Sequence, residues 1–176
     1  YHHGELREAL SRAARQLVVE RGAENFSLAD ACRLAGVSTA APYRHFRDKQ
    51  EILEEIVARG FDEMSERSAL AIKAHGPGTL DGIIAMGQSY VAFALSETPV
   101  FRLMFGQDPV LKQAVCVRDQ GHACLGGVIA QVQLYCSENS VEGDAQAIAV
   151  KLWTFVHGAA SLLIDGDYAV VAPGID

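Results

Sequence analysis

Hydrophobic residues recur at helical spacing along most of this chain, and this pattern predicts a succession of amphipathic helices. The first covers about residues 5–21, where Leu6, Leu10 and Leu17 share one face and Gly22 follows the last turn. Alternation typical of a strand is confined to one short candidate at residues 168–171. The pattern therefore predicts an all-α fold.

The next stretch predicts two short helices separated by a tight turn. Ser27 can cap the first helix, and Asp30 lies three residues later, where it completes a capping box. Gly36 supplies a left-handed position that ends this helix, and Ser38 can cap a second one over residues 39–46. Two short helices joined by a glycine turn are typical of a helix-turn-helix, whose second helix enters the DNA major groove. An ordinary helical hairpin in a core is the alternative, and the pattern favours DNA binding.

The second predicted helix has the chemistry of a DNA-reading element. Its first turn consists of small residues that can approach base edges, and its second turn is aromatic and basic. Pro42 falls at about the fourth helical position, where it removes only the first intrahelical bond, so we expect the helix to continue through it. We expect base contacts from Thr39, Ala40 and Arg44, and phosphate contacts from Ser27, Ser38, Tyr43, His45 and Lys49.

Longer helices are predicted beyond this segment, interrupted by a Gly- and Pro-containing break at residues 75–78. They cover about residues 48–73, 80–96, 109–136 and 144–164, with a short apolar segment at residues 100–105. The Gly126–Gly127 pair inside one of them costs about 1 kcal/mol per glycine relative to alanine. We expect close packing of another helix, or a bend beside a cavity, to compensate for this cost.

The charge is distributed unevenly along the chain. The net charge is −7, but residues 1–50 hold 8 Lys and Arg against 6 Asp and Glu, whereas the remainder holds 7 against 16. A basic end on an acidic body suits a protein that meets DNA phosphates at one end only. Arg7, near the start of the first helix, is a further candidate phosphate contact, with a solvated helix end as the alternative.

Sequence features of export and membrane insertion are weak. The most apolar segment, residues 152–164, is interrupted by His157 and Gly158, so we expect no segment long enough to cross a membrane. There is no leader-like segment, and we therefore expect a cytoplasmic protein.

Two other functional classes are alternatives to DNA binding. An enzyme could use His157 with Asp165, or a cysteine near His122, but no nucleophile, base and orienting group occur at a recognisable spacing. A metal or redox sensor could use Cys116, His122, Cys124 and His157, although the first three extend over more than two helical turns. We expect no catalytic activity, no metal and no cofactor. We interpret the cysteines, which lack a C-x-x-C spacing, as buried reduced thiols.

Two segments resemble a known family. Residues 36–53, GVSTAAPYRHFRDKQEIL, together with the residues before them, are similar to the DNA-binding region of the TetR family of bacterial transcriptional repressors. This resemblance covers about the first third of the chain, and it departs from the family pattern at Ala31 and Cys32, which concern helix packing. Residues 152–166, LWTFVHGAASLLIDG, resemble the tryptophan-histidine-glycine (WHG) signature of one type of TetR C-terminal domain.

The resemblance implies a helix-turn-helix domain at residues 1–48 and a helical ligand-binding and dimerisation domain at residues 49–176. It also implies a repressor that leaves double-stranded operator DNA when a small-molecule effector binds. The nearly all-apolar last helix independently suggests a homodimer, although a central helix of a monomer is the alternative. We expect a mostly apolar effector to contact residues that could otherwise be simple core: Met64, Met86, Tyr90, Phe93, Phe101, Met104, Phe105, His122, Trp153 and His157.

Overall fold

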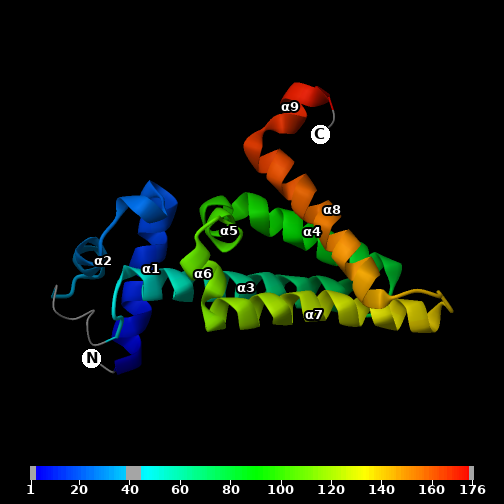
Figure 1. Ribbon diagram of the computed structural model, residues 1–176, viewed down its shortest axis with the longest axis horizontal. Helices are drawn as coiled ribbons and strands as arrows, with labels where there is room; N and C mark the ends of the chain where they lie inside the picture. Colours follow the sequence, from blue (N-terminus) through cyan, green and yellow to red (C-terminus); the bar gives the residue numbers. More distant parts are fainter. Residues whose placement is uncertain (1–2, 39–44, 175–176) are drawn as a thin grey trace. The chain divides into compact units, whose positions relative to one another are not determined.

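The computed structural model describes residues 3–38 and 45–174, and 82% of the protein is helical (Figure 1). No strand occurs among these described residues, which confirms the predicted all-α class. The helices are α1 (His3–Arg21), the 3₁₀ helix η1 (Ala23–Asn25), α2 (Leu28–Ala35), α3 (Lys49–His75), α4 (Leu80–Ser96), α5 (Thr98–Met104), α6 (Pro109–Gln113), α7 (Val115–Glu138), α8 (Ala145–Asp165) and α9 (Asp167–Val171).

The chain forms two compact units, of which the first comprises residues 1–60 and 99–120. Its core is built from the apolar faces of α1, α2 and the first turns of α3, and Phe46 is only 1% exposed there. Gly60 on α3 allows α5 to approach closely, since a Cβ atom at this position would lie 2.6 Å from Met104 Sδ and 3.1 Å from Val100 Cγ1. The buried core residues of α1–α3 include Leu10, Ala14, Leu17, Val18, Phe26, Ala31, Cys32, Ile52, Ile56 and Val57.

The second unit comprises residues 61–98 and 121–176. Thr79 caps α4, because its hydroxyl oxygen accepts a hydrogen bond from the Gly82 amide at 3.0 Å. A Cβ atom on Gly82 would lie 2.2 Å from the Gly76 carbonyl oxygen, so the predicted break before α4 requires glycine at this contact. Helices α4 and α8 pack against each other, and Val156 lies beside Gly87 at their crossing (Figure 1).

Several predicted elements differ from the structure. The helix expected from Pro109 to about residue 136 is divided, because Ala114 has an extended ψ of 129° between α6 and α7. The strand candidate at residues 168–171 belongs instead to the single helical turn of α9, which follows the left-handed Gly166. Two large apolar residues of the helices in the second unit, Phe155 and Ile84, are 76% and 49% exposed.

The expectation that no segment could cross a membrane is also wrong. Helix α8 has 21 residues and a mean hydropathy of 1.6 in its most apolar stretch, which satisfies a length and composition criterion for a span. His157 and Gly158 interrupt the apolar run, but the mean hydropathy of the helix still meets the criterion for a span. One such helix is weak support for a membrane protein, since core helices of soluble proteins satisfy the same criterion.

Candidate nucleic-acid interface

The first half of the helix-turn-helix is held by reciprocal hydrogen bonds at the start of α2. The Ser27 amide donates to Asp30 Oδ2 at 2.8 Å, and the Asp30 amide donates to Ser27 Oγ at 3.2 Å. At the other end, Gly36 is left-handed with φ 69°, and the Val37 amide donates to the Cys32 carbonyl at 3.0 Å. The predicted capping box and glycine turn are therefore confirmed.

The capping box strongly favours the ionised form of Asp30. The hydrogen bond from the Ser27 hydroxyl is the largest cause, followed by the Ser27 amide and Arg33, and together they lower the pKa of Asp30 to about 2. Because this pKa lies below the unfolded value of 3.8, the carboxylate stabilises the fold above about pH 4. That contribution is lost as the pH falls through the folded pKa.

We predict that Ser27→Ala lowers the free energy of unfolding at pH 7 by about 1 kcal/mol, because the N-cap acceptor is removed. The same change removes the largest cause of the lowered Asp30 pKa, so the loss of stability between pH 4 and pH 2 should become smaller. Urea unfolding monitored by circular dichroism from pH 2 to pH 7 measures both effects. A variant as stable as the wild type at pH 7 would show that the cap does not stabilise α2.

A second cap starts the long helix α3. Asp48 Oδ1 accepts a hydrogen bond from the Glu51 amide at 2.9 Å, so Asp48 is the N-cap of this helix. In the first turn, Lys49 Nζ donates to the Glu24 carbonyl at 3.3 Å and lies 4.6 Å from the centroid of the Phe26 ring. Lys49 is therefore fixed against the residues that precede α2.

The predicted DNA contacts fall into two groups. Thr39, Ala40, Tyr43 and Arg44 lie outside the described residues. Of the others, Ser27 and Ser38 are exposed, and His45 and Lys49 are half-buried. The Ser27 hydroxyl already donates to Asp30 Oδ2 at 2.6 Å, so a phosphate contact would have to replace that bond. All eight assignments stay predictions.

Sequence reasoning missed the position of Arg7. The sequence makes Arg7 a candidate phosphate contact or part of a solvated helix end, but in the structure its Nε donates to Glu55 Oε2 at 2.7 Å and its Nη1 donates to the His45 carbonyl at 2.6 Å. Glu51 and Glu55 lie one turn apart on α3, and this pair of carboxylates is compatible with a basic partner but does not indicate which one.

A hydrogen-bonded pair of side chains joins α4 and α8 in the second unit. The Tyr90 hydroxyl and His157 Nδ1 share a hydrogen bond of 2.8 Å between α4 and α8, and the Trp153 ring centroid lies 5.7 Å from that of His157. Burial raises the pKa of Tyr90 and lowers the pKa of His157, so the neutral forms of both side chains are favoured. The pair thus joins α4 to α8 through a hydrogen bond between two neutral side chains.

The other predicted effector contacts are placed differently. His122 is exposed, whereas Met64, Met86 and Phe93 are buried in the second unit. Phe101, Met104 and Phe105 belong to the first unit, where the rings of Phe101 and Phe105 lie 4.9 Å apart. Their roles in effector binding stay predictions.

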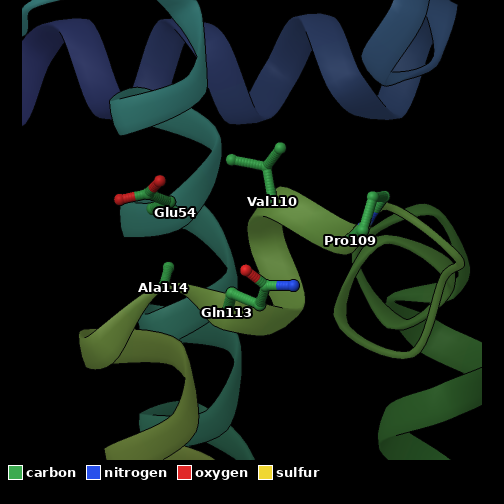
Figure 2. A pocket seen from close by; sticks show the side chains of 5 residues that line it. All are labelled: Glu54, Pro109, Val110, Gln113 and Ala114. Carbon is green, nitrogen blue, oxygen red and sulfur yellow. The ribbon is translucent and has the colours of Figure 1, made fainter.

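A surface hollow of about 440 Å³ lies in the first unit, and none of the predicted contacts lines it. Figure 2 shows Glu54 on α3 facing residues of α6; the lining residues are Glu54, Pro109, Val110, Gln113 and Ala114. Burial is the main cause that raises the pKa of Glu54, and the carboxylates of Asp48, Glu51 and Asp108 act in the same direction. No basic side chain of the described residues lines this hollow, so it offers no charged contact to a phosphate backbone.

The cysteines differ from the expectation of buried thiols. All four are free, but Cys116 is exposed, Cys124 and Cys136 are half-buried, and only Cys32 is fully buried. Within the described part of the chain, no group of three or more His, Cys, Asp and Glu side chains is arranged to hold a metal ion. The metal-sensor alternative is therefore not favoured.

A capped helix and glycine turn on a small helical core, followed by a helical body, define the protein as a helix-turn-helix regulator. Comparisons with known proteins agree with this class. Residues 10–56 match the family model for "Bacterial regulatory proteins, tetR family", and residues 83–176 match the "Tetracyclin repressor-like, C-terminal domain". The chain belongs to the TetR family of bacterial transcription regulators.

Individual relatives support this assignment. Over 76 residues the chain is 36% identical to the HTH-type transcriptional repressor BepR of Brucella suis biovar 1 (strain 1330), which covers 43% of this chain and 36% of that protein. The match thus spans about a third of BepR. A solved structure of a protein with unknown function from Rhodococcus sp. RHA1 is 30% identical, with a TM-score of 0.86 over 100% of this chain and 89% of that chain. A TetR/AcrR-family regulator from Thermobifida fusca YX-ER1 shares the fold at 19% identity, with a TM-score of 0.67 over 91% and 97% of the two chains.

Proposed function

We propose that the protein is a homodimeric, cytoplasmic repressor that binds operator DNA through residues 27–49 and dissociates when a small, mostly apolar effector binds its helical body. The observation that carries this proposal is the Ser27–Asp30 capping box with the left-handed Gly36 turn, in the segment that matches the TetR DNA-binding region. The repressor BepR matches over part of the same chain, which favours repression over activation.

An outward seam on α8 supports the homodimer. Ile148, Leu152, Phe155, Ala159 and Leu162 follow one another at spacings of four and three residues, which is the pattern of a helix–helix seam. Leu152, Phe155 and Leu162 are 38%, 76% and 41% exposed, whereas Ala149 and Ala160 on the inner face are buried. A helix that is apolar on both faces needs a second partner, and another copy of the chain supplies one.

Helix α7 offers a matching feature of small residues. Ala123, Gly127, Ala130 and Leu134 follow the same spacing, and all four are exposed. A Cβ atom added at Gly126 or Gly127 would meet no atom within 4 Å, so packing within one protomer does not account for these glycines. Close approach of a helix from the second copy would offset their cost of about 1 kcal/mol each.

The Tyr90–His157 pair supports an effector site in the second unit. Buried Met86 and Phe93 lie on the same helix as Tyr90, so the polar pair is set among apolar side chains. We propose that the C-terminal domain is of the WHG type, with Trp153, His157 and Gly158 as its signature. In a dimer, the two helix-turn-helix domains can lie at different distances from each other. An effector that binds more tightly to the state with one of these distances would shift the population toward that state.

Lys49 provides a prediction about phosphate binding. We expect Lys49→Ala to weaken binding to all DNA sequences alike and to reduce the slope of log K against log salt by about 1, because one phosphate contact is lost. Fluorescence anisotropy of a fixed duplex at five salt concentrations measures this slope. An unchanged slope would assign Lys49 to the contacts with Glu24 and Phe26 alone.

The proposed function is tested by selection from a random pool of double-stranded DNA with the purified full-length protein. We expect enrichment of one inverted repeat, because a two-fold dimer reads two half-sites. A variant with Gly36→Pro, which cannot adopt the left-handed turn, serves as the non-binding control. Recovery of random sequences by the wild type would contradict the proposal.

A further inference from the structure

The guanidinium of Arg7 joins three parts of the first unit. Arg7 Nη1 donates to the His45 carbonyl at 2.6 Å, and Nε donates to Glu55 Oε2 at 2.7 Å. The guanidinium carbon also lies 4.3 Å from the centroid of the Phe46 ring, which is almost completely buried. One side chain from α1 therefore contacts α3 and also His45 and Phe46, the last two residues of the predicted DNA-reading helix, residues 39–46.

These contacts leave the guanidinium poorly placed for DNA. Nη2 lies 2.5 Å from Glu55 Oε2, so every nitrogen of the group has a partner. Glu51 Oε1 lies 4.0 Å from Nη1, and two nearby carboxylates would repel a phosphate at this position. The contacts of the Arg7 guanidinium are thus made within the first unit, and they do not favour the phosphate contact that its position in the sequence suggests.

We propose that Arg7 is a positioning residue for sequence recognition, which fixes the backbone at His45 and Phe46 and thereby the register of the base-reading residues before them. The inference rests on the proposed DNA binding. A planar guanidinium that is hydrogen-bonded to both a carboxylate and a carbonyl fixes the distance and the orientation between these two groups. The ammonium of a lysine, on a flexible side chain, does not fix the orientation. Loss of the fork should reduce discrimination between DNA sequences more than it reduces attraction to DNA in general.

Arg59 provides a matched control. Arg59 lies on α3, and its Nη2 lies 2.6 Å from Glu8 Oε2 on α1 and 2.8 Å from Glu55 Oε1 one turn earlier on α3. It therefore joins α3 to α1 through Glu8 and shares the Glu55 carboxylate with Arg7. The side chains of Arg7 and Arg59 are 39% and 40% exposed, respectively. Arg59→Ala therefore removes a comparable ion-pair bridge whose pairs lie on α1 and α3.

The experiment compares wild type, Arg7→Ala, Arg7→Lys and Arg59→Ala as full-length chains. Anisotropy is measured across a salt series with the duplex selected by the wild type and with a shuffled duplex, and thermal unfolding is measured in parallel. We expect Arg7→Ala to lose at least tenfold in affinity for the selected duplex. Its affinity for the shuffled duplex should stay within twofold of the wild-type value, and the salt slope on that duplex should not change. Arg59→Ala should keep the wild-type ratio between the two duplexes, and Arg7→Lys should not restore it.

Three results would overturn the inference. An equal loss on both duplexes with a slope reduced by about 1 would make Arg7 a phosphate contact. An equally reduced ratio in Arg59→Ala would indicate a general effect on the stability of the unit. A wild-type ratio in Arg7→Lys would show that charge alone suffices, and this variant decides the matter should Arg7→Ala not fold. Absence of a selected duplex for the wild type would instead refute the proposed function, and the inference with it.

Discussion

Replacing Phe155 with glutamate is expected to produce a folded monomer whose affinity for the selected operator is at least 100-fold lower than that of the wild type. Phe155 is 76% exposed at the centre of the α8 seam, so its removal leaves no cavity in the protomer. A central aromatic residue of an interface contributes about 3 kcal/mol, and a buried unpaired carboxylate adds a further penalty. Since about 1.4 kcal/mol corresponds to tenfold, dimerisation should weaken by more than 100-fold.

Operator binding should decrease with dimerisation because each half-site is read by one copy. Multi-angle light scattering gives the oligomeric state, and anisotropy with the selected duplex gives the affinity. Leu70→Glu on α3 is the matched control, since Leu70 is 68% exposed and lies outside the α7 and α8 seams. The control should remain dimeric and bind normally. A Phe155→Glu variant that is still a dimer would place the interface on another surface.

Replacing Arg44 with alanine is expected to remove most of the discrimination between the selected operator and shuffled DNA. An arginine that donates to one guanine with two hydrogen bonds contributes about 1–3 kcal/mol of specificity, which is about tenfold to 100-fold in the ratio of affinities. Binding to shuffled DNA should decrease much less, because only a general phosphate attraction operates there. This expectation depends on the sequence alone, since Arg44 lies outside the described residues.

The discriminating measurement is the affinity for each of a set of duplexes that carry single base-pair changes across one half-site. For Arg44→Ala we expect the wild-type penalty to disappear at one guanine position and to remain at the other positions. Arg33→Ala is a suitable control, because Arg33 pairs with Asp30 within α2 and is not expected to contact bases. An equal loss of affinity for cognate and shuffled DNA in Arg44→Ala would contradict the base-reading role.

Local chemistry was predictable from the sequence to a large extent. The cap at Ser27 and the turn at Gly36 use a side chain and a backbone angle that act within four residues. The helices around them were therefore placed to within a few residues. The break at Ala114 was missed because alanine is a strong helix former, and nothing in the neighbouring residues indicates its extended backbone.

Contacts between distant residues were not predictable in the same way. Arg7 and Glu55 are 48 positions apart, and a charged residue near a helix start is equally typical of a solvated surface. Hydrophobicity also did not indicate on which face Phe155 lies, because α8 is apolar on its inner and outer faces. The structure separates these cases, since it shows which side chains are already covered within one protomer.

The most direct test of sequence-specific DNA binding is fluorescence anisotropy with DNA from upstream of the protein's own gene, compared with shuffled DNA across a salt series. We predict tight binding to the upstream DNA, weaker binding to the shuffled DNA, and a steep decrease in both with salt. Equal and weak binding to both would place the operator elsewhere in the genome. Absence of binding to either DNA at low salt would contradict the assignment of residues 27–49 as a DNA-binding element.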